Sequence, residues 1–312
     1  MPIEKLLQKN FDLTSFTTLR IRGQAEFFII INNKQELVKA IAWAKAKKLP
    51  LVILAGGSNI VIVRKKIKGL VLKISGERYI INKNYLICWA GTGLTKLSKI
   101  SALAGLTGLE WSFGMPGSIG GAVRGNAGAY GFDMSNLVAE VEAYDLIKKR
   151  FVKLKKQACN FSYRNSIFKK RKNLLIVGVK LKLAKGVSKE IKALSQKNFD
   201  HRFRANPKEP SAGCVFKNLE YKKVIKQNKR LAEDLAAKGL VRGGKIGAAY
   251  LIDQLGLKGK TAGQAKVSEK HANFIINIGK AKSKDVIKLI NLIKRKIKHK
   301  YKINLEEEIE YF

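Results

Sequence analysis

Residues 110–131 read EWSFGMPGSIGGAVRGNAGAYG, and this stretch decides how the rest of the chain is interpreted. Seven glycines fall between Gly114 and Gly131, with few bulky side chains among them. Glycine is tolerated where the backbone takes a positive φ or comes close to a ligand. Ile119 and Val123 are too apolar for a Gly/Ser linker, although a set of tight turns is an alternative. The stretch is typical of backbone folded around a large anion.

A second glycine-rich segment, AGGSN at residues 55–59, follows the apolar run LVIL at 51–54. A strand that ends in this way presents backbone N–H groups and two polar side chains together, which suits a pyrophosphate. A hairpin turn would look similar, but two such segments in one chain favour a phosphate site. The run Gly91-Thr92-Gly93 resembles the opening of a dinucleotide-binding fingerprint, yet Lys96 stands where the third glycine would fall. We therefore exclude a Rossmann domain.

The composition bounds the class of protein. The chain has 312 residues, 46% of them hydrophobic, which suffices for two globular domains with separate cores. No apolar run approaches the roughly eighteen residues of a membrane-spanning helix, and the N-terminus MPIEKLLQKN lacks a signal-peptide core. We therefore expect a cytoplasmic protein without membrane association. Cys88, Cys159 and Cys214 are far apart in sequence, so neither a disulfide framework nor a metal site is expected.

The formal net charge of +39 raises the question of nucleic-acid binding. Only 13 of the 62 basic residues are arginine, and the lysines are spread over nearly every expected element. Base-edge recognition favours arginine in localised patches, so a general lysine bias on solvated surfaces explains the charge better. We expect no dedicated nucleic-acid partner, although a positive surface would assist encounter with an anionic substrate.

The hydrophobic pattern predicts an α+β fold in two domains. Strands are expected at residues 27–31, 51–54, 69–74, 85–90, 138–146, 174–183, 273–278 and 303–311. Helices are expected at residues 34–48, 94–103, 188–203, 229–238, 247–255 and 283–300. The run LAKGVS separates a strand from a helix, so the domains are expected at 1–185 and 186–312. The first domain is expected to have two lobes, about 1–80 and 81–185.

Two internal segments carry side chains suited to anions or to proton transfer. FSYRNS at residues 161–166 places Arg164 among residues suited to burial, where a guanidinium could grip a carboxylate with two hydrogen bonds. A strand with one surface arginine is the alternative. PSAGCVFKN at residues 210–218 places Cys214 after small residues. This thiol is either a small buried apolar group or a proton donor.

The C-terminal segment INLEEEIEYF, residues 303–312, contains consecutive glutamates. As a strand, it places Glu307 on an otherwise apolar face and Glu308 on the opposite face. The pattern alone therefore singles out Glu307 as the unusual carboxylate, although charged chain ends are usually just solvated.

Taken together, these segments resemble the UDP-N-acetylenolpyruvoylglucosamine reductase (MurB) family, flavoenzymes of bacterial peptidoglycan precursor synthesis. The resemblance covers nearly the whole chain and agrees in order, spacing and residue type. It rests on FTTLRIRGQAEF (16–27), ILAGGSNIVI (53–62), GLEWSFGMPGSIGGAVRGNAGAYG (108–131), FSYRNSIF (161–168), PSAGCVFKN (210–218), AAYLIDQLGLKGKTAGQAKVSEKHANFIIN (248–277) and LEEEI (305–309). Only 50 positions separate Arg164 from Cys214, which resembles the shorter branch without an extra substrate-covering loop.

The resemblance implies an FAD-binding domain of the vanillyl-alcohol-oxidase (PCMH) type, followed by an α+β substrate-binding domain. It implies FAD as the cofactor and NADPH as the hydride donor. Some relatives in that superfamily bind FAD covalently through His or Cys, and neither phosphate segment contains either residue, so non-covalent FAD is expected. The implied cofactor contacts are Gly56, Gly57, Ser58, Asn59, Gly114, Pro116, Gly117, Ser118, Gly120, Gly121, Ala122, Asn126, Ala127 and Gly128.

The implied reaction reduces UDP-N-acetylglucosamine enolpyruvate to UDP-N-acetylmuramate in two half-reactions within one cleft. Hydride addition to the vinyl terminal carbon leaves carbanion or enol character beside the carboxylate, which must be stabilised and protonated. By family position, Arg164 and Glu308 stabilise this charge and residue 214 donates the proton. Serine is usual there, and Cys214 replaces it with a competent and more acidic donor. The implied substrate contacts are Tyr163, Lys217, Asn218 and His271.

Some points stay open. Strand periodicity emphasises Glu307 and the family register emphasises Glu308, which a β-bulge would reconcile. Lys266 stands where many relatives carry Gln, with no effect that the sequence reveals. The alternative enzyme is another FAD-dependent oxidoreductase of the same fold that acts on a sugar or alcohol. The alternative from another class is a basic nucleic-acid-binding protein, which would be colourless. We expect a monomer with a small-molecule substrate.

Overall fold

The computed structural model describes residues 3–312, which divide into two compact units. Each unit is discontinuous in sequence, so neither corresponds to one continuous part of the chain. The helix expected to open the second domain belongs to unit 1 up to Arg202, which places the boundary after residue 202 instead of after residue 185. Unit 1 comprises the described residues up to Asp12, Gln24–Gly57 and Lys66–Arg202; unit 2 comprises Leu13–Gly23, Ser58–Lys65 and Phe203–Phe312.

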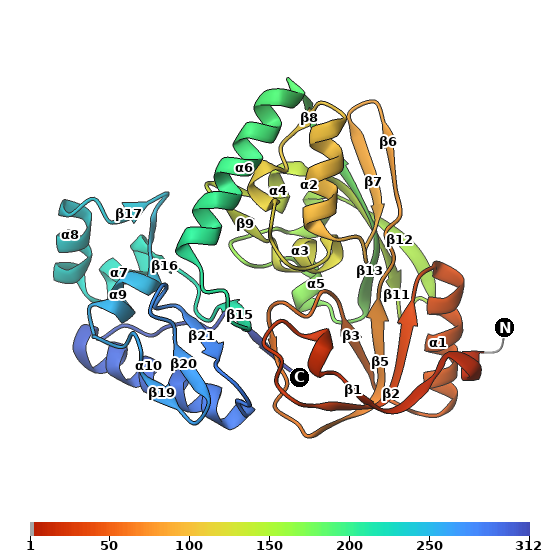
Figure 1. Ribbon diagram of the computed structural model, residues 1–312. Helices are drawn as coiled ribbons and strands as arrows, with labels where there is room; N and C mark the ends of the chain where they lie inside the picture. Colours follow the sequence, from red (N-terminus) through yellow and green to blue (C-terminus); the bar gives the residue numbers. More distant parts are fainter. Residues whose placement is uncertain (1–2) are drawn as a thin grey trace. The chain divides into compact units, whose positions relative to one another are not determined.

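The first sheet of unit 1 contains three parallel strands and has the order β1-β2-β5-β3 (Figure 1). Its members are β1 (Gln8–Asp12), β2 (Gln24–Ile31), β5 (Lys66–Ile74) and β3 (Leu51–Leu54), with β1 antiparallel to β2. Helix α1 (Lys34–Ala46) packs against β2 and β5, and it begins where the Asn33 side chain accepts a hydrogen bond from Glu36 N. Since parallel strands end at the same edge of a sheet, the residues that follow β3 lie beside the end of β5.

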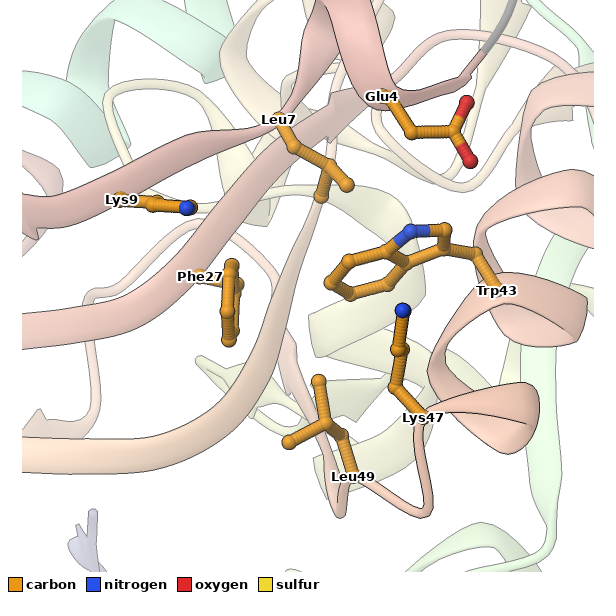
Figure 2. A pocket seen from close by; sticks show the side chains of 7 residues that line it. All are labelled: Glu4, Leu7, Lys9, Phe27, Trp43, Lys47 and Leu49. Carbon is orange, nitrogen blue, oxygen red and sulfur yellow. The ribbon is translucent and has the colours of Figure 1, made fainter.

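A pocket of about 620 Å³ lies in this part of unit 1 (Figure 2). Aromatic rings form part of its wall, with the Phe27 and Trp43 centroids 5.2 Å apart in an edge-to-face arrangement. The lining residues are Glu4, Leu7, Lys9, Phe27, Trp43, Lys47 and Leu49. None of them belongs to the predicted site, so we assign this pocket no part in the reaction.

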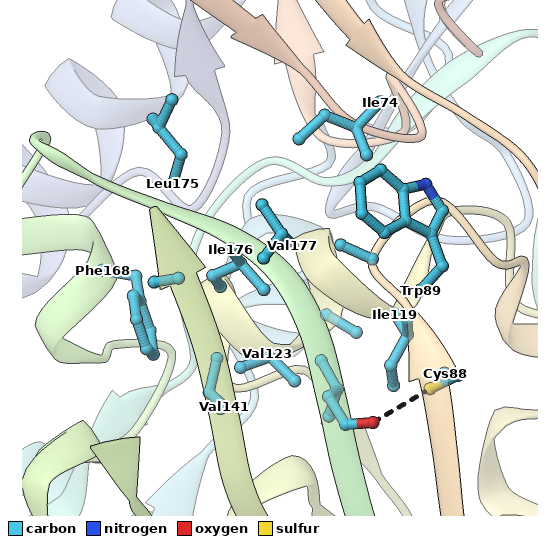
Figure 3. Packing of buried hydrophobic residues seen from close by; sticks show 14 of the residues in the cluster. Ile74, Cys88, Trp89, Ile119, Val123, Val141, Phe168, Leu175, Ile176 and Val177 are labelled. Atoms are coloured by element: carbon cyan, nitrogen blue, oxygen red, sulfur yellow. Dashed lines mark hydrogen bonds between the residues drawn. The ribbon is translucent and has the colours of Figure 1, made fainter. Parts of the chain in front are cut away.

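The second sheet of unit 1 is antiparallel throughout and has the order β12-β11-β13-β7-β6. Helix α3 (Ile119–Gly125) packs on its strands, and Figure 3 shows Ile119 and Val123 among buried residues such as Val177 of β13. The glycine-dense stretch therefore contains a helix anchored by its few apolar residues. The strands are β6 (Tyr79–Asn82), β7 (Tyr85–Trp89), β11 (Val138–Asp145), β12 (Arg150–Lys155) and β13 (Leu174–Lys182).

The remaining helices, short strands and 3₁₀ turns complete unit 1. Helix α6 is amphipathic with only two fully buried residues, Ile191 and Ser195. The helices are α2 (Leu94–Leu103), α4 (Met134–Leu137), α5 (Ile167–Lys170) and α6 (Ser188–Ala205), and the short strands are β8 (Leu106–Thr107), β9 (Gly128–Ala129), β10 (Phe132–Asp133) and β14 (Ala184–Lys185). The 3₁₀ turns are η1 (Ile3–Leu6), η3 (Glu110–Ser112) and η4 (Lys156–Cys159); another, η2 (Thr14–Phe16), lies in unit 2.

Unit 2 is built on an antiparallel sheet of order β15-β21-β20-β19 against which helix α10 (Ser283–Tyr301) packs. The buried residues of α10 follow helical spacing: Val286, Leu289, Ile290, Ile293 and Ile297. The strands are β15 (Ser211–Cys214), β21 (Phe274–Asn277), β20 (Ala265–Val267), β19 (Thr261–Ala262), β16 (Leu219–Glu220), β17 (Val241–Arg242), β18 (Lys245–Ile246), β4 (Ile60–Val61) and β22 (Glu310–Tyr311). The other helices are α7 (Tyr221–Gln227), α8 (Lys229–Ala237) and α9 (Ala248–Asp253).

The predicted α+β fold is confirmed, but the predicted strand at 303–311 is largely wrong. Only β22 is a strand there, paired in parallel with β4, and one isolated bridge joins Glu307 to Phe216. Ile303, Leu305 and Ile309 are buried as their alternation predicted. The alternation therefore recorded burial correctly, while strand formation also requires a partner backbone along the whole segment.

Candidate active site

The two glycine-rich segments predicted to bind phosphate lie against each other in unit 1. Segment 55–57 follows β3, and segment 117–122 includes the first residues of α3. A Cβ added at Gly56 would lie 2.8 Å from Ser118 N and closer still to Gly117 Cα. Only glycine allows this approach, because any side chain would displace the facing backbone. The structure therefore brings together the two predicted halves of the cofactor cradle.

Ser118 is the polar side chain that marks this cradle. It occupies the N-cap position of α3 but makes no capping hydrogen bond. Its hydroxyl is buried and has no hydrogen-bond partner within residues 3–312. A buried hydroxyl without a partner costs about 1–3 kcal/mol, which an anion could offset by accepting a hydrogen bond from it. The close approach at Gly56 packs the two segments against each other, and the available Ser118 hydroxyl donor beside them fits the phosphate part of FAD.

The other end of α3 anchors the turn that carries Arg164. Asn126 caps the helix in a left-handed conformation (φ 44°), and its Nδ2 donates to Ser162 O at 3.0 Å. Reciprocal backbone bonds of 3.0 Å between Ser162 and Asn165 close a two-residue turn. Arg164 sits in this turn with φ 55°, and its guanidinium lies 5.5 Å from the centre of the Tyr163 ring. The turn, held by the end of α3, therefore fixes the backbone position of Arg164.

In unit 2, the segment that carries Cys214 runs beside the C-terminal glutamates. Glu308 N donates to Val215 O at 2.8 Å, and Lys217 N donates to Glu306 O at 2.9 Å. These bonds flank the bridge between residues 216 and 307. The structure therefore places Cys214 one residue before the backbone partner of Glu308.

The two candidate carboxylates have different surroundings. Glu307 Oε1 accepts from Lys294 Nζ at 2.8 Å, and Glu307 Oε2 accepts from Tyr311 OH at 2.5 Å. Burial, followed by this hydrogen bond, raises the pKa of Tyr311 above its ordinary value. Both oxygens of Glu307 are thus committed to structural contacts. This arrangement gives Glu307 a structural role, which accounts for its unusual place in the sequence pattern.

Asn59, predicted as a cofactor contact, holds the backbone around Glu308. Its Nδ2 donates to Glu308 O at 2.9 Å, and its own carbonyl accepts from Glu310 N at 3.0 Å. Ser58 and Asn59 both belong to unit 2, whereas Gly56 and Gly57 belong to unit 1. The Asn59 amide donor therefore holds the backbone of the Glu308 segment in this structure.

The predicted substrate contacts in unit 2 have protein partners of their own. Lys217 Nζ lies 3.1 Å from Glu306 Oε2, and this bond is the main cause that lowers the pKa of Glu306. Asn218 Oδ1 accepts from Ala248 N at 3.3 Å, at the start of α9. Burial lowers the pKa of His271, and nearby Lys258 lowers it further. His271 is therefore better suited to neutral hydrogen bonding than to carrying charge.

Sequence reasoning missed Asn273, which holds the Cys214 segment. Asn273 is 2% exposed, accepts from Phe216 N at 2.9 Å and donates to Phe216 O at 2.8 Å through its side chain. Its backbone carbonyl also accepts from Val215 N at 2.8 Å. The signal was a polar residue at the start of the apolar run NFIIN, where burial requires such a group to be paired.

Two family models match this chain. Residues 206–312 match the model described as UDP-N-acetylenolpyruvoylglucosamine reductase, C-terminal domain, and residues 25–149 match an FAD binding domain. A UDP-N-acetylenolpyruvoylglucosamine reductase from Prochlorococcus marinus (strain NATL2A) is 37% identical over 308 residues, covering 97% of each chain. The chain belongs to the UDP-N-acetylenolpyruvoylglucosamine reductase family.

Further relatives agree with this family assignment. The UDP-N-acetylenolpyruvoylglucosamine reductase from Fervidobacterium nodosum is 36% identical over 305 residues, covering 96% of this chain and 90% of the relative. The crystal structure of the reductase of that name (MurB) from Thermus caldophilus superposes with a TM-score of 0.75 at 29% identity, covering 98% of each chain. The predicted FAD-binding fold with a C-terminal α+β domain is thereby confirmed.

No helix in residues 3–312 is long and apolar enough to cross a membrane. In the same residues, no three His, Cys, Asp or Glu side chains are grouped so that they could hold a metal ion.

Proposed function

We propose that this protein is an FAD-dependent reductase that consumes NADPH and converts UDP-N-acetylglucosamine enolpyruvate into UDP-N-acetylmuramate for peptidoglycan synthesis. The observation that carries the proposal is the match over 97% of both chains to a relative named for this reductase activity. The meeting of the two glycine segments at Gly56 and Ser118 supports the cofactor part, since the buried Ser118 hydroxyl beside them can donate a hydrogen bond to a diphosphate. A cytoplasmic location and a monomeric state belong to the same proposal.

The proposed cofactor contacts are the backbone of segments 55–57 and 114–122 together with the Ser118 hydroxyl. Residues 126–128 follow directly after α3 and complete the set. When bound, FAD supplies two-electron hydride chemistry. Everything else in the reaction, namely the handling of charge and of one proton, is assigned to side chains of the chain.

Three side chains are assigned to charge and proton handling. Reduction at the vinyl terminal carbon leaves negative charge on the carbon beside the substrate carboxylate. Arg164 and Glu308 are proposed to polarise that carboxylate and so stabilise the enol form. Cys214 is proposed to transfer its Sγ proton to the carbon, which forms the new C–H bond and leaves a thiolate that water reprotonates. Lys217, Asn218, His271 and Tyr163 are proposed to position the substrate.

The function is tested on purified protein by absorbance near 450 nm and by anaerobic NADPH oxidation. We expect a yellow protein whose NADPH consumption requires UDP-N-acetylglucosamine enolpyruvate. A colourless protein that cannot be reconstituted with FAD would contradict the proposal. Oxygen consumption with a sugar or alcohol, without NADPH use, would instead identify an oxidase of the same fold.

A further inference from the structure

Lys73 is a partly buried lysine near the end of β5, and no motif in the sequence singled it out. In the parallel sheet it pairs opposite Leu54, the last residue of β3. Its Nζ donates a hydrogen bond to Ala55 O. Ala55 directly precedes Gly56 and Gly57, so the ammonium group lies at the beginning of the first glycine segment. In open α/β sheets, ligands bind at this edge, beyond the carboxyl ends of parallel strands.

The charge of Lys73 has no counter-charge within residues 3–312. The Ala55 carbonyl is its hydrogen-bond partner, and no carboxylate there forms an ion pair with it. Burial lowers the pKa of Lys73, and no nearby carboxylate opposes this shift. A buried ammonium is costly unless it is paired, and proteins normally supply an opposite charge. This environment therefore points to an anion that does not belong to the chain.

A second observation at the same place is independent of Lys73. Ala55 also faces α3, because a Cβ added at Gly121 would lie 3.3 Å from Ala55 Cβ. Three residues before Gly121 is Ser118, whose buried hydroxyl has no hydrogen-bond partner within the described chain. The segment next to Ser118 is in turn approached by Gly56. One short loop thus bonds a cation without a counter-charge and packs against the backbone of Ser118, whose hydroxyl has no partner within the described residues.

We propose that Lys73 is the counter-charge of a diphosphate bound beside the loop Gly56–Gly57 and the Ser118 hydroxyl, and hence a cofactor-binding residue. The inference rests on the FAD site proposed above and adds to it a residue outside both glycine segments. Lysine suits this task because its compact ammonium neutralises phosphate charge without a fixed hydrogen-bond geometry. The competing explanation is a purely structural one, in which Lys73 only ties down the Ala55 carbonyl.

The two explanations predict opposite effects of Lys73→Met on the protein without cofactor. If Lys73 is a counter-charge, removing it relieves an uncompensated, partly buried charge, so the melting temperature of the apo-protein stays the same or rises. The dissociation constant for FAD then increases at least tenfold, or about 1.4 kcal/mol. If Lys73 is only a structural tie, apo-protein stability and FAD affinity fall together. Thermal unfolding of the apo-protein and flavin-fluorescence titration measure the two quantities separately.

Lys73→Gln and Lys68→Met complete the design. Gln keeps a neutral donor for Ala55 O, so its FAD affinity falls like that of Lys73→Met only if the charge matters. Lys68 is exposed on the same strand, and Lys68→Met removes one positive charge with no expected change in either measurement. An unchanged FAD affinity in Lys73→Met, or a parallel loss of apo-protein stability, overturns the inference. Wild-type protein that binds no FAD overturns the proposed function as well, which distinguishes the two failures.

Discussion

Replacing Asn273 with alanine tests how the segment that carries Cys214 is held. The Asn273 side chain accepts a hydrogen bond from Phe216 N at 2.9 Å and donates one to Phe216 O at 2.8 Å. Phe216 is only 1% exposed, so water cannot readily replace these bonds. Asn273→Ala therefore leaves one buried backbone donor and one buried backbone acceptor without partners.

The magnitude follows from these two orphaned groups. Each buried polar group that loses its partner costs about 1–3 kcal/mol, so the pair costs about 2–6 kcal/mol. We expect the free energy of unfolding to fall by about 3 kcal/mol, a large share of the 5–15 kcal/mol that is typical of globular proteins. Asn273→Asp should be nearly as harmful, because its carboxylate cannot donate to Phe216 O.

The assay is urea unfolding at saturating FAD, monitored by far-UV circular dichroism. Asn304→Ala is the matched control, since Asn304 is exposed and its loss should change stability by less than about 0.5 kcal/mol. Tryptophan fluorescence would report on unit 1, because that unit contains all three tryptophans of the chain, Trp43, Trp89 and Trp111. Asn273 lies in unit 2, so circular dichroism is the signal to follow. If Asn273→Ala unfolds within about 0.5 kcal/mol of the wild type, the two bonds contribute little and the reasoning fails.

Three other substitutions test the site more directly. Cys214→Ser should keep substantial activity, whereas Cys214→Ala should lose about 10²–10⁴-fold in single-turnover reduction of the substrate; full turnover by the alanine variant would remove Cys214 from the mechanism. Because burial lowers the pKa of His271 below its ordinary value of 6.5, its contribution to stability is present above pH 6.5 and is lost as the pH falls through the folded-state value. Urea midpoints between pH 7.5 and 5 should therefore fall more in the wild type than in His271→Gln, and equal slopes would contradict this. Asn59→Asp removes the donor to Glu308 O, so kcat should fall by about tenfold with little change in FAD affinity; the reverse order of effects would assign Asn59 to the cofactor.

Local features explain what the sequence could predict of the fold. Helix α10 was expected at 283–300 and is found at Ser283–Tyr301, because a long amphipathic spacing specifies a helix without reference to distant residues. The segment 303–309 also buries its alternating apolar residues but has only one bridge to another strand. Alternation records which side chains are buried, whereas the partner strand is set by the tertiary fold.

The same distinction, between what a local pattern records and which partner the tertiary fold supplies, applies to the site. Gly56 could be predicted because close backbone approach leaves glycine as the residue that fits, and the two glycine segments do meet. Lys73 and Asn273 could not be assigned, since a polar residue in an apolar strand shows only that some partner must satisfy it. Glu307 was singled out by its pattern, and the structure pairs it with Lys294 and Tyr311. An unusual carboxylate in a sequence therefore signals a structural ion pair as readily as a catalytic group.

Unit 2 is built from three separate stretches of the chain, which affects how it folds during translation. Asn59 and Glu308 are bonded to each other across 249 positions, and β4 beside Asn59 finds its strand partner only in β22. At about 5–20 residues per second, the early segment waits roughly 12–50 s for that partner to be synthesised. Residues Leu13–Gly23 and Ser58–Lys65 must therefore stay free of wrong pairings until translation is nearly complete. A premature stop at Glu308 would cost unit 2 both the partner of β4 and the Glu308 backbone that Asn59 holds.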